Sequence, residues 1–139
     1  MITVLLALGV GGIAQAAIVL DDSVVRLEQA ELRLSHEVHP PSASTVAQTV
    51  QLPDTWPAKR YAIGDNGWYR FYVSRAQAPD AIWGIYIPRL TMNAAVYFND
   101  KLLGDGGSFA EPLARNWARP LYFDIPSSLW RDGENRIDI

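Results

Sequence analysis

The residues best suited to chemistry gather in one long segment, residues 104–119, which has no regular pattern of apolar residues. It carries side chains that can bond hydroxyl groups, together with one flat aromatic ring: Asp105, Glu111, Arg115, Asn116, Trp117 and Arg119. A tryptophan ring can stack on the apolar face of a sugar, while carboxylate, amide and guanidinium groups bond its hydroxyls. Long loops in small domains are often binding loops. We therefore predict a ligand-binding site in this segment, formed by Asp105, Arg115, Asn116, Trp117 and Arg119.

An alternative for the same segment is that Trp117 packs over one end of the domain while the arginines are solvated. Two residues outside the segment are further candidates for the ligand-binding site. Trp56 lies in a second long loop, which runs to a Gly-Asp-Asn-Gly cluster at 64–67. Arg70 lies between Tyr69 and Phe71, so in a strand it points to the opposite face from these rings. There it can reach a ligand or pair with a carboxylate on a neighbouring strand.

Catalytic, metal-binding and nucleic-acid-binding sites have little support in the sequence. The acidic residues lie mostly in turns, one at a time, with no pair that a strand would hold at the spacing of about 5–9.5 Å used by glycosidases. His36 and His39 are close together but lack a third ligand. The absence of cysteine excludes disulfides, thiol nucleophiles and cysteine-based zinc sites. The net charge of −3 does not suit a nucleic-acid surface. We expect no catalytic residue, metal or cofactor.

The elements that would position the site read as short strands. Residues 68–74 alternate strictly, with Tyr69, Phe71 and Val73 on one face, and we expect Trp68 and Trp83 to join the core too. Five other segments have a β-like pattern between Gly and Pro breaks, and residues 23–35, which also fit helical spacing, favour a strand at their end. The five are 46–52, 81–87, 94–98, 120–125 and 135–139. Residues 126–130 resemble one helical turn. This pattern is typical of an all-β, antiparallel β-sandwich.

Two asparagines are expected to fix turns. Asn99-Asp100 separates two apolar runs, and both residue types tolerate positive φ, so the pair suits a type I′ hairpin. Asn135 follows Gly133 and can hydrogen-bond the backbone of its turn.

The first twenty residues differ from the rest because they carry no charge. Ala14-Gln15-Ala16 supplies the small-x-small pattern of a signal-peptidase site, so residues 1–16 are interpreted as a signal peptide and 17–139 as the mature domain. A buried core segment or an uncleaved membrane anchor are the alternatives. Export would place the domain outside the cytoplasm, in the periplasm.

Several segments, in order, resemble the sugar-binding jelly-roll domain of glycoside hydrolase family 2. They are Leu52-Pro53-Asp54-Thr55-Trp56, Gly67-Trp68-Tyr69-Arg70, the hairpin from Val96 to Gly104, Phe123-Asp124-Ile125-Pro126 with Leu129, and the ending Gly133 to Ile139. The hairpin has Asn99-Asp100 where that family favours Asn-Gly. The resemblance implies a jelly-roll fold of the galactose-binding type and a non-catalytic, sugar-binding role.

A narrower resemblance concerns Arg115-Asn116-Trp117-Ala118-Arg119-Pro120-Leu121. This run is similar to the periplasmic input domains of bacterial membrane sensors, among them sensor histidine kinases of two-component systems. The resemblance implies a sensory domain for signal transduction, with a small molecule or carbohydrate as ligand and membrane attachment through a part beyond residue 139. A domain of a secreted family 2 hydrolase is the alternative. Since the sequence stops within a strand pattern, we expect a truncated domain whose final strand lacks a partner and promotes aggregation.

Overall fold

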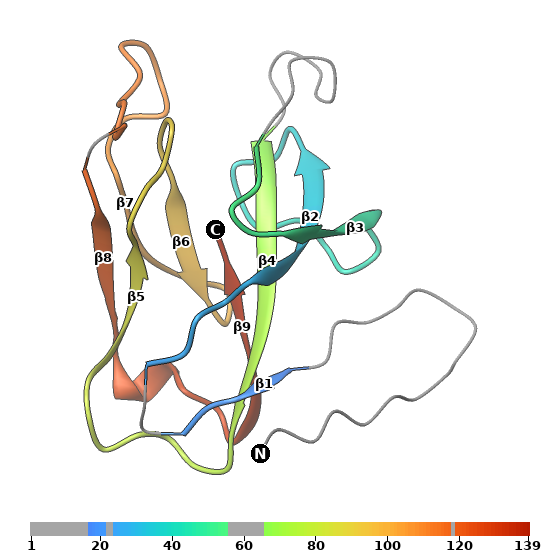
Figure 1. The fold of residues 1–139 in the computed structure, drawn as a ribbon, viewed down its shortest axis with the longest axis vertical. Coiled ribbons are helices and arrows are strands. Elements are labelled where there is room, and N and C mark those ends of the chain that lie inside the picture. Colours follow the sequence, from blue (N-terminus) through green and yellow to red (C-terminus); the bar gives the residue numbers. More distant parts are fainter. Residues whose placement is uncertain (1–16, 22–23, 56–65, 118) are drawn as a thin grey trace.

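The computed structural model describes residues 17–21, 24–55, 66–117 and 119–139, and these form an antiparallel β-sandwich, as predicted (Figure 1). The elements are β1 (Ile18–Val19), β2 (Gln29–Ser35), β3 (Ala47–Gln51), β4 (Asn66–Arg75), β5 (Trp83–Ile87), β6 (Ala95–Phe98), β7 (Lys101–Asp105), β8 (Leu121–Ile125), the 3-10 turn η1 (Ser127–Leu129) and β9 (Gly133–Asp138). In the described ranges no helix could cross a membrane.

The strands form two sheets of unequal size. The larger sheet has the order β3-β2-β4-β9-β6-β7, and β1 adds a short parallel pairing to β4. The smaller sheet pairs β5 with β8, antiparallel and in continuous register from Trp83↔Ile125 to Ile87↔Leu121. Figure 1 shows β5 and β8 on the side of the molecule that carries β6 and β7.

The core lies between these sheets and follows the period-two pattern. Phe71 and Val73 are buried there with Ile85 of β5 and Ile125 of β8, and Tyr69 packs partly buried at the margin. Trp130, which follows η1, contacts the ring of Phe98 at a centroid distance of 4.8 Å. Alternating apolar residues therefore bring the two sheets together, because each strand turns every second side chain inward.

The opposite face of β4 is buried as well, and Trp68, which is only 5% exposed, packs there as a buried residue, as predicted. Trp68 lies on the far side of the sheet and packs against Tyr97, with ring centroids 5.8 Å apart. Residues 36–45 lie alongside that face, because side chains of the sheet donate hydrogen bonds to their carbonyls. Trp68 Nε1 reaches Glu37 O at 3.3 Å, and Arg70 Nη2 reaches Pro41 O at 2.7 Å.

The final strand is fully integrated into the larger sheet. β9 pairs with β4 on one side and with β6 on the other, and Ile137 is part of the core. The prediction that this strand lacks a partner is therefore wrong. Sequence alone could not reveal it, because an alternating pattern shows that a strand exists but not which strands flank it.

The two predicted asparagine turns are confirmed. Asn99 and Asp100 both have positive φ, 48° and 70°, as a type I′ turn requires. The Asn135 amide donates to Gly133 O at 3.0 Å and accepts from Arg131 N at 2.8 Å. Asn99 Nδ2 also donates to Asn135 Oδ1 at 2.7 Å, so the two turns support each other.

Candidate functional site

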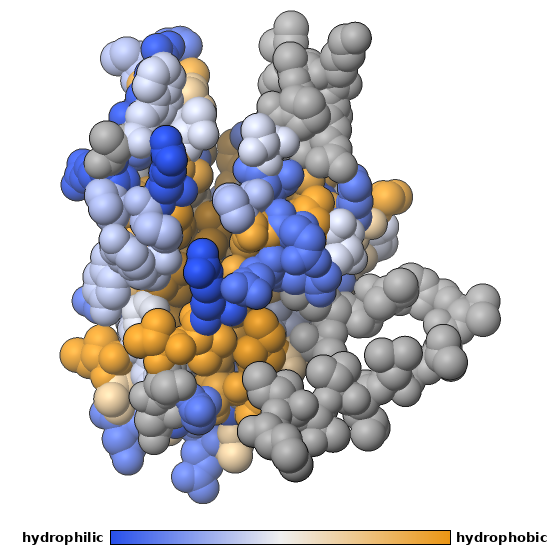
Figure 2. Space-filling view, viewed as in Figure 1, coloured by the Kyte–Doolittle hydropathy of each residue, from blue (hydrophilic) through white to orange (hydrophobic). Residues whose placement is uncertain are grey.

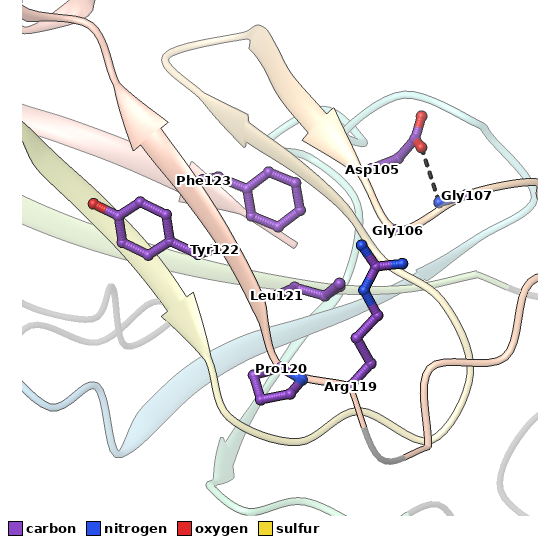
Figure 3. A pocket seen from close by; sticks show the side chains of 8 residues that line it. All are labelled: Asp105, Gly106, Gly107, Arg119, Pro120, Leu121, Tyr122 and Phe123. Carbon is purple, nitrogen blue, oxygen red and sulfur yellow. Dashed lines mark hydrogen bonds between the residues drawn. The ribbon is translucent and has the colours of Figure 1, made fainter.

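A hollow of about 370 Å³ lies where β7 ends and β8 begins, at the end of the sandwich that carries the long loop (Figure 3). Its lining comes from both strands and from the loop between them: Asp105, Gly106, Gly107, Arg119, Pro120, Leu121, Tyr122 and Phe123. Figure 2 shows mostly polar surface toward this end of the β5–β8 pair, whereas apolar residues gather toward the opposite end. The hollow thus coincides with the segment that the sequence singles out.

Asp105 forms one wall of the hollow through a tight local turn. Its Oδ1 accepts a hydrogen bond from Gly107 N at 3.0 Å, so the carboxylate is fixed above the turn (Figure 3). Gly107 has φ +125°, a conformation that only glycine adopts without strain. The second carboxylate oxygen has no hydrogen-bond partner within the part of the chain that the structure describes, so it can accept from a ligand.

Asn116 is a buried residue that holds the loop in place through hydrogen bonds, whereas the sequence suggested that it contacts a ligand. It is only 5% exposed, and its backbone N donates to Met92 O at 2.7 Å. Its side-chain Nδ2 reaches both Gly106 O (3.2 Å) and Asn93 Oδ1 (3.3 Å). Asn93 in turn donates to Gly107 O at 2.6 Å. The side-chain amides of Asn93 and Asn116, here called the asparagine clasp, therefore hold the Asp105 turn to the chain that precedes β6.

Arg119 brings a cation to the hollow. Its backbone N donates to Asn116 O at 3.2 Å, which fixes the start of β8 relative to the clasp. The side chain rises toward the turn of Gly106 and Gly107 (Figure 3). In the ranges described, the guanidinium has neither a hydrogen bond nor an ion pair, so all of its donors are available. The hollow therefore combines a carboxylate, a guanidinium and an apolar wall from Pro120, Leu121 and Phe123.

Trp117 does not share this hollow with Asp105 and Arg119. It is 60% exposed and borders a separate hollow of about 250 Å³ together with Arg89, Leu90 and Thr91. Arg115 is exposed and lines neither hollow. The long loop thus presents its candidate residues to two separate hollows or to solvent, and the tryptophan is not packed as core.

Arg70 takes the structural alternative. It is 0% exposed, and its Nε donates to Asp138 Oδ1 at 2.6 Å. This position on the far face of the larger sheet, below residues 36–45, removes Arg70 from the candidate site. Trp56 falls outside the described residues. In the described ranges no group of three His, Cys, Asp or Glu side chains could hold a metal, and this includes the surroundings of His36 and His39.

Sequence reasoning missed Asn93 and the apolar wall of Pro120, Leu121 and Phe123. Asn93 directly precedes a predicted strand, a position where a polar amide usually signals only a loop end. Comparison of the chain with known protein families finds no matching family model, and comparison with curated proteins finds no match.

Proposed function

We propose that this chain is an extracytoplasmic ligand-binding domain that recognises a small polyhydroxylated molecule, of the carbohydrate class, in the hollow at Asp105 and Arg119. We further propose that it serves as the sensory input of a membrane-bound signalling protein. The binding proposal rests on one observation: the hollow holds the available guanidinium of Arg119 and the fixed carboxylate of Asp105 beside an apolar wall.

The chemistry of the hollow suits a sugar better than other small ligands. The free oxygen of Asp105 accepts a hydroxyl proton, and Arg119 donates to a ring or hydroxyl oxygen. Pro120 and the partly exposed Phe123 line the hollow and can cover the C–H face of a sugar ring, while Leu121, 6% exposed, lies behind them. A volume of about 370 Å³ is at the lower end of the range of about 300–1,000 Å³ of small-molecule sites. An anionic ligand would be repelled by the carboxylate of Asp105.

The sensory part of the proposal is supported by the sequence. The run from Arg115 to Leu121 resembles sensor input domains, and the same run supplies Arg119, Pro120 and Leu121 to the hollow. The signal-peptide pattern of residues 1–16 supports export. Signalling would require that the sugar bind two conformations of the parent protein with different affinity.

The binding proposal is tested by titrating the domain with glucose, galactose and mannose in a calorimeter. We expect at least one of them to bind, and Arg119→Ala and Asp105→Asn each to weaken binding about tenfold or more, since each removes one directional hydrogen bond. Arg115→Ala is the matched charge control and Trp117→Ala the control in the same loop; both should bind as the wild type does. Equal affinity in all five proteins, or no binding of any hexose, would contradict the proposal.

The sensory role has its own test, in which the full-length parent protein is followed by cell fractionation and by its signalling output. We expect the parent protein in the inner membrane and a change in output on adding the bound hexose, which Arg119→Ala abolishes. Recovery of the parent as a secreted hydrolase would instead favour the non-catalytic domain of a glycoside hydrolase family 2 enzyme.

A further inference from the structure

The outward face of the smaller sheet is made of four side-chain positions. Because strand residues alternate, Trp83, Ile85 and Ile87 of β5 turn inward while Gly84 and Tyr86 turn outward, and β8 does the same with Tyr122 and Asp124. The register places Tyr86 directly across from Tyr122 and Gly84 across from Asp124. These four residues, here called the tyrosine face, therefore form one contiguous surface.

Both tyrosines of this face are well exposed, Tyr86 at 60% and Tyr122 at 58%. Within the described ranges neither ring makes an aromatic or cation–π contact, so each has ring surface open to a ligand. Exposed rings at adjacent cross-strand positions leave apolar area in water that the sandwich itself does not use. Their phenol oxygens keep the surface wettable, which distinguishes it from an apolar docking patch.

Gly84 makes the face flat. A Cβ atom at this position would overlap with the hydroxyl, Cζ and Cε2 of Tyr122, so the Tyr122 ring lies across the glycine. Only the absence of a side chain at Gly84 allows the ring to rest on the backbone of β5. One side of the ring is thus seated and the other faces outward.

Asp124 adds the only charge among the four positions. Asp124, as a hydrogen-bond acceptor for the Tyr122 hydroxyl, raises the pKa of Tyr122, with smaller contributions from desolvation and from the carboxylate charge. The carboxylate has further lone pairs that can accept from a hydroxyl group. A ligand for this surface should therefore offer a flat C–H face to the rings and hydroxyl donors to Asp124, and it should not be an anion.

From these contacts we infer that the tyrosine face is a second carbohydrate-binding surface, which stacks consecutive rings of a neutral hexose oligosaccharide on Tyr86 and Tyr122. Directly opposed strand residues have Cβ atoms about 5 Å apart, so two neighbouring sugar rings can lie along the pair. Tyr122 projects from β8 on the side away from Arg119 (Figure 3). Tyr122 also borders the Asp105–Arg119 hollow, but Gly84, Tyr86 and Asp124 do not line it. The surface therefore adjoins the hollow at Tyr122, and stacking on it does not require Arg119.

The inference is tested by NMR titration of ¹⁵N-labelled domain with cellohexaose, maltohexaose and laminarihexaose. We expect one of them to shift the backbone amides of Gly84, Tyr86 and Asp124 in a saturable way. Tyr86→Ala and Tyr122→Ala should each weaken this binding about tenfold. Leu102→Ala removes a comparably exposed apolar side chain from β7 and should leave affinity unchanged.

Three further variants distinguish loss of binding from structural damage and from effects at the hollow. Gly84→Ala keeps both tyrosines but displaces the Tyr122 ring, so it should weaken binding while Tyr122→Phe retains most of it. Arg119→Ala should retain hexasaccharide binding at the tyrosine face even where it abolishes hexose binding in the hollow. The inference is overturned if none of the three hexasaccharides shifts these amides, or if folded Tyr86→Ala and Tyr122→Ala proteins bind like the wild type.

Discussion

Arg70 Nε donates to Asp138 Oδ1 across 2.6 Å, and both side chains are about 1% exposed. The pair joins β4 to β9 at directly opposed positions in the middle of the larger sheet. Asp138 is also bonded through its other oxygen, which accepts from Arg136 Nε at 2.7 Å. This buried ion pair lies on the far face of the sheet and fixes β9 beside β4.

Breaking this pair from one side should be costly. Asp138→Ala leaves the Arg70 guanidinium buried without its counterion, so we expect a loss of about 3–5 kcal/mol in the free energy of unfolding. The double variant Arg70→Met/Asp138→Leu removes both charges and should lose less than the sum of the single changes. Urea unfolding of the wild type, Asp138→Ala, the double variant and its two single variants, Arg70→Met and Asp138→Leu, measures these free energies. A cost below about 1 kcal/mol for Asp138→Ala would be incompatible with a buried pair.

The hairpin turn offers a sharper comparison between its two central residues. Asn99 donates to Leu129 O at 2.8 Å and accepts from Arg136 N at 2.9 Å, in addition to its bond with Asn135. Asn99→Gly keeps the positive φ but loses these bonds, and should cost about 2–3 kcal/mol. Asp100→Gly gives up only an exposed ion pair and should stay within about 1 kcal/mol of the wild type. Equal thermal midpoints for the two variants would show that φ alone decides this position.

The strands were predictable because a two-sided sheet imposes period two on the chain. Phe71 and Val73 face the core as the alternation indicates, and Asn99-Asp100 adopts the positive φ values that its residue types favour. The cover over Trp68 on the far face was not predictable, because it depends on residues 36–45, whose proline-rich sequence gives no sign of where they lie. The parallel pairing of β1 with β4 was missed for a related reason, since two residues are too few to show a pattern.

The candidate site was predictable in location but not in the roles of its residues. An irregular loop rich in polar side chains marked the sandwich end, and Asp105 and Arg119 do line a hollow there. Nothing in the order of residues distinguishes Asn116, which turns inward to Gly106, from Trp117, which turns outward. Those directions depend on hydrogen bonds to Asn93, a residue distant in sequence.

The asparagine clasp should control the shape of the hollow. In Gly106→Ala the new Cβ would lie 2.5 Å from Asn93 Oδ1 and 2.7 Å from Asn116 Nδ2, so the amides must move. We expect a loss of about 1–3 kcal/mol in stability and weaker hexose binding. Asn93→Ala should weaken binding in the same direction without introducing a clash. If both variants keep wild-type affinity and melting temperature, the clasp does not position Asp105.

The Tyr122 hydroxyl should titrate above the ordinary tyrosine pKa of about 10, because the folded state favours the protonated donor to Asp124. Because the folded-state pKa is raised, any stability from the interaction of Tyr122 with Asp124 is present below the unfolded-state pKa and is lost as the pH rises through the folded-state pKa. Asp124→Asn removes the charge and should lower the pKa of Tyr122. The Tyr122 Cζ chemical shift, followed from pH 8 upward, measures both values. A Tyr122 pKa unaffected by Asp124→Asn would contradict this influence of Asp124.

The most direct test of the binding site is a crystal structure of the domain soaked with glucose, galactose or mannose, using the hexose that calorimetry selects. We expect the sugar in the hollow where β7 meets β8, with hydroxyls in hydrogen-bond distance of the Asp105 carboxylate and the Arg119 guanidinium. A sugar bound elsewhere on the sandwich, with this hollow holding only solvent, would contradict the assignment.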